Sequence, residues 1–232
     1  MAPADVTAMF DSIAPVYDRL NTLMTAGQDD RWRRAAVRAA GVARGGFVID
    51  VACGTGKLSA LLADAVGPFG RVVAVDLSER MIAEAQREHR DVVQLEFGVA
   101  DALALPLPDG AFDAATIAFG LRNLADYEAG FRELARVVRP NGRVVCLELT
   151  QPRPRWWGRL FLASFKRLAP LAGRIFGAGD AYHYLPTSLE RFPEADVLAE
   201  TMRRAGLTDV AFRWLGLRSV ALHVGRVPPP RA

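Results

Sequence analysis

The chain has 232 residues, enough for one large domain, and 51% of them are hydrophobic while 24% are charged. This balance is typical of a folded globular protein and excludes a disordered or fibrous chain. The formal net charge of +3 is too small to indicate nucleic-acid binding, so we expect no nucleic-acid partner.

Cysteine usage and apolar runs bear on the compartment. Cys53 and Cys146 both lie in apolar, strand-like segments, which favours free thiols in a reducing compartment. The first twenty residues contain acids and no apolar core, unlike a signal peptide, and no run approaches the ~20 apolar residues of a membrane span. We therefore expect a cytoplasmic protein, with peripheral contact to the inner face of the cell membrane left open.

After a helical stretch over 1–44, strand and helix patterns alternate. Apolar strand patterns lie at 47–53, 71–77, 92–98, 112–119 and 143–149. Helical patterns separate most of them at 57–66, 78–90 and 126–138, and Ser78 is a natural N-cap. Arg139 to Gly142 are expected to end the last of these helices. This alternation predicts an α/β fold, with a parallel sheet covered by helices on both faces.

The C-terminal third follows a different pattern. A helix is predicted over 194–206, and strands over 210–216 and 219–227 are expected to form a hairpin that closes the sheet. Residues 151–193 do not fit the alternation and are interpreted as a helical insertion. Residues 227–232 are expected to be a disordered tail. The whole chain, 1–232, is interpreted as a single domain.

The stretch "VIDVACGTGKLSALLA" (48–63) joins a strand to a helix through a glycine turn, as nucleotide-binding loops do. A phosphate-binding P-loop is excluded, because Val51 stands where its first glycine belongs and Leu58 where its Ser or Thr belongs. A dinucleotide fingerprint keeps its first two glycines but has Ser59 at the third position. That interpretation, an NAD-dependent oxidoreductase, is weak but stays open.

A third type of loop explains more residues. Gly54 and Gly56 would let the backbone pass close to a ligand at the carboxyl edge of the sheet. Asp50 lies inside an apolar strand and needs a partner there, either a backbone amide of the loop or the ammonium group of an amino-acid ligand. Asp76 ends the next strand, where a carboxylate can accept hydrogen bonds from both ribose hydroxyls.

The segment "VADALALPLPDGAFDAA" adds a second acid after the third strand. Asp101 could bind an adenine amino group, with Ala102 packed beside the ring. In this order, the glycine loop, the ribose acid and the adenine-side acid resemble class I S-adenosyl-L-methionine-dependent methyltransferases. Asp76 as a helix-capping acid and Asp101 as a turn acid are the alternatives.

Four further segments, 10–34, 119–123, 136–152 and 181–193, resemble the ubiquinone/menaquinone-biosynthesis C-methyltransferases. The resemblance implies a Rossmann-like, mostly parallel seven-stranded sheet with a C-terminal antiparallel hairpin, a helical lid over 1–44 and a helical insertion on the substrate side. It also implies S-adenosyl-L-methionine as cofactor. The cofactor-binding positions expected from the residues and the family together are Asp50, Gly54, Thr55, Gly56, Asp76, Leu77, Asp101 and Ala102.

The sequence departs from the family pattern at several positions. The family usually has His at Asp29 and a basic residue or His at Asp30, and its glycine loop usually continues with Asp where this chain has Lys57. Asn141 replaces a glycine, and Ala118 replaces a Ser or Thr that some members carry. We expect the reversed charge at Asp29 and Asp30 to alter a lid contact or the pocket for the quinone ring.

The implied reaction is methylation of a ring carbon of a prenylated hydroquinone, with demethylmenaquinol as the first expectation. It needs a proton acceptor and a donor that stabilises the oxygen's negative charge. Arg122 is the candidate donor and Asn123 would orient the ring oxygen or a water, while a surface ion pair is the alternative for Arg122. The candidate proton acceptors are Tyr17, Asp18 and His183. No cluster has metal-ligand spacing, so we expect metal-independent chemistry.

The insertion carries six basic residues between Gln151 and Gly179 and no acid. Large apolar residues and basic residues fall on different faces of a predicted helix there. A basic amphipathic helix can contact an anionic membrane, here through 153–174, where a prenylated quinol resides. An ordinary helix capping the core is the alternative.

Other functions stay open on the sequence alone. A methyltransferase acting on another aromatic small molecule fits the departures at Asp29 and Asp30. A non-catalytic cofactor-binding partner in a quinone-synthesis assembly fits the cofactor residues. The sequence also leaves a homo-oligomer open.

Overall fold

The structure is a computed structural model that describes residues 3–14, 17–25, 27–150 and 188–230. Seven strands form one sheet in the order β3-β2-β1-β4-β5-β7-β6. The strands from β3 to β5 run parallel, and β7 is antiparallel to both β5 and β6. The strands are β1 (Phe47–Val51), β2 (Arg71–Asp76), β3 (Leu95–Val99), β4 (Phe112–Ala118), β5 (Val138–Leu149), β6 (Thr208–Leu215) and β7 (Val220–Arg226). The predicted α/β fold and antiparallel C-terminal hairpin are confirmed.

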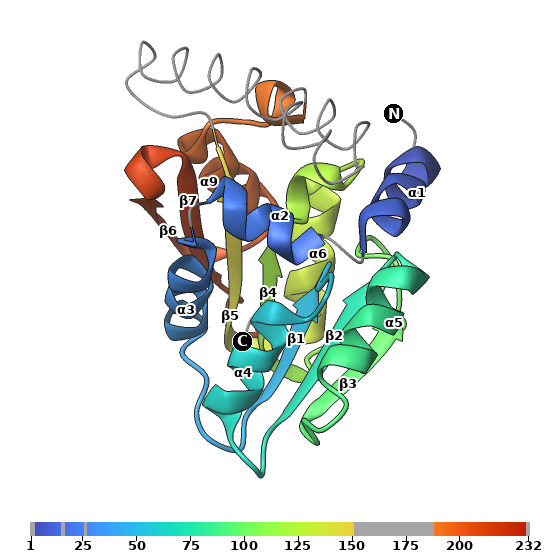
Figure 1. The fold of residues 1–232 in the computed structure, drawn as a ribbon. Helices are drawn as coiled ribbons and strands as arrows, with labels where there is room; N and C mark the ends of the chain where they lie inside the picture. Colours follow the sequence, from blue (N-terminus) through green and yellow to red (C-terminus); the bar gives the residue numbers. More distant parts are fainter. Residues whose placement is uncertain (1–2, 15–16, 26, 151–187, 231–232) are drawn as a thin grey trace.

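Helices cover both faces of the sheet (Figure 1). On one face, α3 (Asp29–Ala40) and α4 (Lys57–Val66) bury an apolar cluster against the strands. On the other face, α6 (Tyr127–Val137) and α9 (Ala195–Arg204) bury a second cluster. The helix α5 (Glu79–Glu88) packs against β2 and β3. Because both faces are covered, the central strands are apolar on both sides, as the sequence indicated.

Local signals set most element boundaries. The Ser78 hydroxyl accepts a hydrogen bond from the Met81 amide at 3.0 Å, so the predicted N-cap of α5 is confirmed. The helix α6 ends at Val137, close to the expected end, but the following strand begins earlier than expected, because β5 starts directly after α6 at Val138 and not at Arg143. Val138 pairs with Phe112 and Arg143 with Ala114, so the intervening residues form a bulge within the strand.

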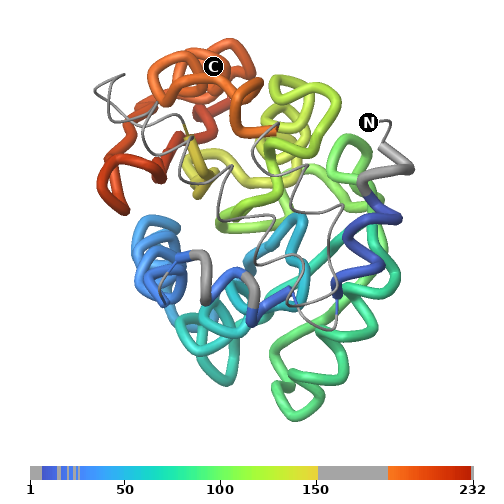
Figure 2. Tube along the Cα trace, turned by 45° about the horizontal axis from the view of Figure 1, so that its top comes forward, coloured from blue at the N-terminus to red at the C-terminus, as the bar shows by residue number. Residues whose placement is uncertain are grey.

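The N-terminal helices divide into two parts. The helix α2 (Tyr17–Met24) crosses the carboxyl end of the sheet, and α1 (Pro3–Ile13) lies against α5 (Figures 1 and 2). By contrast, α3 packs against β4, β5 and β7 and belongs to the core. Among the described residues, α1 and α2 are the helices that cover the end of the sheet at which the loops after β1, β2 and β4 meet.

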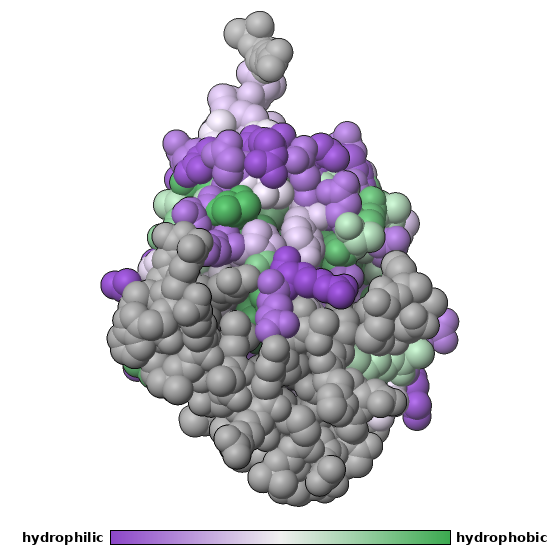
Figure 3. Space-filling view, turned by 90° about the horizontal axis from the view of Figure 1, so that it is seen from above, coloured by the Kyte–Doolittle hydropathy of each residue, from purple (hydrophilic) through white to green (hydrophobic). Residues whose placement is uncertain are grey.

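In the view from above, the described residues that are visible are mostly hydrophilic, and the visible hydrophobic ones form small, separate patches (Figure 3). Within the described ranges, no helix is both long and apolar enough to span a bilayer. The predicted amphipathic helix over 153–174 lies outside the described residues.

Candidate functional site

A cavity of about 750 Å³, including the space at its mouth that is open to solvent, lies between α1–α2 and the carboxyl ends of β1, β2 and β4. Thr7, Phe10 and Tyr17 line it from the helices, and Asp76 and Asn123 are among the residues that line it from the strand ends. This is the edge at which open α/β sheets bind ligands.

The residues that directly follow β1 and β4 bring the two strand ends into contact beside the cavity. Ala52 and Phe119 directly follow these strands, line the cavity and have left-handed backbone conformations, with φ of 53° and 59°. A side chain at Gly120 would meet the Cβ atom of Ala52 at 2.4 Å, so the two strand ends are in contact. Such conformations are strained outside glycine and cluster at functional sites.

Asp76 is held at the rim of the cavity by backbone amides. Its carboxylate accepts hydrogen bonds from the Gly54 and Ser78 amides, each at 2.9 Å. Burial raises the pKa of this carboxyl group, and these amide bonds oppose the rise. Gly54, with φ of 56°, lines the cavity opposite Tyr17, as expected for a loop that approaches a ligand.

The part of the cavity beside Asp76 has apolar walls and a carboxylate acceptor. Leu77, Met81 and the buried Ala102 provide apolar walls, and Asp101 provides a carboxylate acceptor. The Asp101 side chain is oriented by a 2.9 Å hydrogen bond from the Leu103 amide. The structure thus brings Asp76, Leu77, Asp101 and Ala102 together in one cavity, and their chemistry fits an adenosine group.

Two partners were considered for Asp50, a loop amide and the ammonium group of a ligand, and among the described residues its partners are instead two hydroxyl groups. Asp50 is buried, and its carboxylate accepts hydrogen bonds from the Ser59 hydroxyl at 2.6 Å and the Thr116 hydroxyl at 2.7 Å. Burial raises the pKa of Asp50 to about 6, although both hydrogen bonds lower it. The amide of Gly54, in the glycine loop, binds Asp76.

The reason for glycine at position 56 also differs from the prediction. Gly56 is the N-cap of α4 with φ of 82°, and a Cβ atom there would lie 2.9 Å from the His89 ring and 3.1 Å from Phe97. The His89 Nε2 atom lies 3.1 Å from the Thr55 carbonyl oxygen. Gly56 therefore makes room for the His89 ring, which contacts the backbone of the glycine loop.

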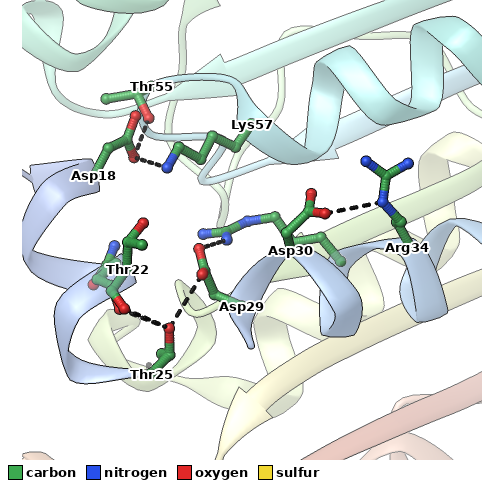
Figure 4. Close-up of polar contacts among 10 residues, drawn as sticks. Asp18, Thr22, Thr25, Asp29, Asp30, Arg34, Thr55 and Lys57 are labelled. Carbon is green, nitrogen blue, oxygen red and sulfur yellow. Dashed lines mark hydrogen bonds and ion pairs between the residues drawn. The ribbon is translucent and has the colours of Figure 1, made fainter. Parts of the chain in front are cut away.

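Thr55 and Asp18 join the glycine loop to α2. The buried Thr55 hydroxyl donates to the Asp18 carboxylate at 2.9 Å, and the Lys57 ammonium lies 3.5 Å from the same oxygen (Figure 4). Asp18, a candidate proton acceptor in the sequence, is thus directed at the loop. It fastens the helix above the cavity.

Arg122 lies in a buried ion pair. Its guanidinium is 2.5 Å from the Glu148 carboxylate and donates to the Phe119 carbonyl at 2.8 Å. The alternative of a surface ion pair is wrong, because both side chains are almost fully buried. Asn123, in the same 3-10 turn (Leu121–Asn123), lines the cavity. Glu148 was not among the predicted site residues, although a carboxylate within the apolar strand "RVVCLEL" is a signal for it.

Tyr17 lines the cavity and packs edge-on against Phe10, with ring centroids 5.9 Å apart. Burial raises the pKa of the Tyr17 phenol, and the nearby charges of Arg122 and Arg33 oppose the rise. The phenol is therefore neutral near pH 7. His183 lies outside the described residues, and within them no group of three His, Cys, Asp or Glu side chains could hold a metal ion.

The fold and the site together define a class I S-adenosyl-L-methionine-dependent methyltransferase. A solved SAM-dependent methyltransferase from Aquifex aeolicus matches with a TM-score of 0.66 over 90% of this chain and 97% of that chain. Its sequence identity is 17%, so this likeness bears on the fold alone.

The sequence comparisons identify the family. The model of the ubiE/COQ5 methyltransferase family matches residues 2–227, and the chain belongs to this family. The demethylmenaquinone methyltransferase of Thermus thermophilus is 45% identical over 222 residues, which cover 95% of this chain and 100% of the relative. That of Desulfitobacterium hafniense is 40% identical over 231 residues, with coverage of 97% and 90%. The predicted family and cofactor, S-adenosyl-L-methionine, are confirmed.

Proposed function

We propose that this protein transfers the methyl group of S-adenosyl-L-methionine to a ring carbon of a prenylated hydroquinone, with demethylmenaquinol as substrate. The full-length relatives named for this activity support the choice of substrate. The observation that carries the proposal is the continuity of the cavity. One space joins the acids that fit adenosine, Asp76 and Asp101, to Asn123 and the aromatic side chains beneath α1 and α2.

In this proposal, Asp76 binds the ribose hydroxyls, and Leu77, Asp101 and Ala102 hold the adenine. Gly54 and Thr55 form the loop beneath the cofactor, and Asp50 faces its amino-acid part. When bound, the cofactor supplies a methyl group already activated on a positively charged sulfur. The protein must then position the ring carbon and exclude water.

The remaining residues act on the acceptor. Asn123 orients the ring oxygen, and Phe10 and Tyr17 shield the reacting carbon from water. Arg122 is a positioning residue, because its bonds to Glu148 and to the Phe119 carbonyl fix the turn that presents Asn123. His183 stays a prediction for the proton acceptor.

The test uses purified protein with isotope-labelled S-adenosyl-L-methionine and demethylmenaquinone, in reduced and oxidised form. We expect one labelled methyl group on the reduced ring only, because the oxidised ring lacks the electron-rich carbon. Asn123→Ala should lower kcat more than it changes cofactor affinity. If the quinol is not methylated while another aromatic acceptor is, the proposed substrate is wrong. Cofactor binding without transfer to any acceptor would favour the non-catalytic alternative.

We also propose peripheral contact with an anionic membrane through 153–174. The support is the sequence pattern alone, with six basic residues and no acid between Gln151 and Gly179. Co-sedimentation with vesicles containing anionic lipid should exceed that with neutral vesicles, and salt should weaken it. Binding that ignores both lipid charge and salt would contradict this proposal.

A further inference from the structure

A second, smaller pocket continues the main cavity past the glycine loop. The two pockets share Tyr17, Ala52, Gly54 and Ala118. Beyond these shared residues, the smaller pocket is lined by charged side chains from three different elements. They are Arg33 from α3, Asp50 from β1 and Lys57 at the start of α4.

These charges match a zwitterion, with cations for a carboxylate and an anion for an ammonium group. Asp50 is 1% exposed and Arg33 is 6% exposed, so both charges lie in a poorly solvated environment. There, ionic hydrogen bonds to a ligand are stronger than in water. Both side chains line this one pocket, and the charge of Arg33 is among the causes that lower the pKa of Asp50.

We infer that Arg33 binds the carboxylate of the amino-acid part of S-adenosyl-L-methionine in this smaller pocket. The inference rests on the proposed placement of adenosine beside Asp76 and Asp101. If adenosine occupies the main cavity, the junction between adenosine and the amino-acid part lies beside the residues that both pockets share. The amino-acid end then reaches the pocket that Arg33 and Asp50 line.

Arg33 is held in a fixed orientation, unlike Lys57. Its Nη1 donates to the buried Asp29 carboxylate, and its guanidinium lies over the Phe119 ring, 5.4 Å from the centroid. Burial alone would raise the pKa of Asp29, but the charge and hydrogen bond of Arg33 hold it below its usual value. The planar guanidinium has five N–H donors, so it can bind Asp29 and a second carboxylate together.

Lys57 is a weaker candidate. Its side chain is 34% exposed and its ammonium already lies 3.5 Å from Asp18. On this view, Asp29 is the orienting partner of Arg33. The unusual acid at position 29 therefore bears on cofactor binding rather than on the quinone ring.

The test compares two ligands by isothermal titration calorimetry. One is S-adenosylhomocysteine, and the other is its aminopropyl analogue, which lacks only the carboxylate. Arg33→Met should raise the Kd of S-adenosylhomocysteine by about 10- to 100-fold, the range of a lost hydrogen bond to a charged group. The Kd of the analogue should change by less than about threefold, within the scatter of individual contacts.

Two further variants control for folding. Arg34→Met, next on the same helix, removes an exposed Arg that pairs with Asp30 (Figure 4), and neither Kd should change. Arg33→Lys keeps a cation opposite Asp29, so it should fold and should lose part of the discrimination between the ligands. If the Arg33→Met variant still binds the analogue, its main cavity is intact.

The outcomes separate the inference from the proposed function. If Arg33→Met weakens both ligands equally, or neither, the carboxylate does not bind Arg33 and the inference is wrong. If wild-type protein binds neither ligand, the proposed cofactor site itself is wrong. If Arg33→Met weakens the binding of S-adenosylhomocysteine but not of the analogue, the result supports both the inference and the proposed cofactor site.

Discussion

Two buried ion pairs lie near the carboxyl end of the sheet. Arg33 pairs with Asp29 on α3, and Arg122, in the turn after β4, pairs with Glu148 of β5. A buried pair must offset the cost of removing both charges from water, and it does so only with good geometry and further hydrogen bonds. Each pair has further hydrogen bonds. Asp29 also accepts one from the Thr25 hydroxyl, and Glu148 also accepts hydrogen bonds from two backbone amides.

His223 leads to a prediction about pH. It is fully buried in β7, its Nε2 lies 2.8 Å from the Ala195 carbonyl, and among the described residues its Nδ1 has no hydrogen-bond partner. Burial lowers the pKa of His223 to about 4, whereas an unfolded His titrates near 6.5. The unfolded chain thus binds the extra proton first. Stability from this group is complete above about pH 6.5 and is lost as the pH falls toward 4.

The variant His223→Gln keeps a donor for Ala195 and does not titrate. Wild-type protein should lose about 3 kcal/mol more than this variant between pH 6.5 and pH 4, measured by urea unfolding. Asp50, whose raised pKa acts in the opposite direction, is common to both proteins and cancels in the difference. Parallel pH curves for the two proteins would contradict the prediction.

The residues best predicted from sequence are those whose place along a strand decides their role. Asp76 and Asp101 follow β2 and β3, and strand ends in a parallel sheet meet at one edge, so local pattern was enough to bring them together. Glu148 and His89 depend on partners far along the chain. Glu148 pairs with a residue 26 positions away and His89 with one 34 positions away, and no local pattern records those contacts.

At the level of elements, Glu148 ties β5 to the turn that carries Asn123. Glu148→Gln leaves the Arg122 guanidinium buried opposite a neutral group, and we expect a loss of about 3–5 kcal/mol in unfolding free energy. The double variant Arg122→Met with Glu148→Leu removes both charges and should recover most of that loss. Urea unfolding measures the unfolding free energies of the single and the double variant. A single variant within 0.5 kcal/mol of wild type would mean that the pair is not buried as described.

The fastening of α2 to the glycine loop leads to a prediction about exchange. Asp18→Ala removes the acceptor of the Thr55 hydroxyl and the partner of Lys57. These contacts together are worth about 1–2 kcal/mol, so dissociation of S-adenosylhomocysteine should become about tenfold faster. Stopped-flow fluorescence measures the rate. Asp30→Ala is the matched control, since Asp30 pairs only with the exposed Arg34 among the ion pairs described, and an equal effect there would contradict the role of Asp18.

For the whole molecule, alternating apolar strands and amphipathic helices were enough to predict the class of fold. Each helix that connects two parallel strands packs its apolar side on the sheet. The helical and strand periodicities of the sequence are therefore enough to predict the layers of the fold. The placement of β7 between β5 and β6, and the bulge after Val138, were not predictable in this way. They depend on pairing between distant strands, such as Cys146 with His223, which local sequence does not specify.

Ligand binding couples the cavity to global stability. A ligand that binds only the folded chain, present at about 100 times its Kd, adds about 2.7 kcal/mol to the unfolding free energy. For a chain of this size that corresponds to a rise in Tm of about 5–10 °C, which differential scanning calorimetry resolves. S-adenosylhomocysteine should produce this shift and NAD should produce none. Asp76→Ala should abolish it because the ribose loses its acceptor, and a shift with NAD alone would revive the dinucleotide interpretation of the glycine loop.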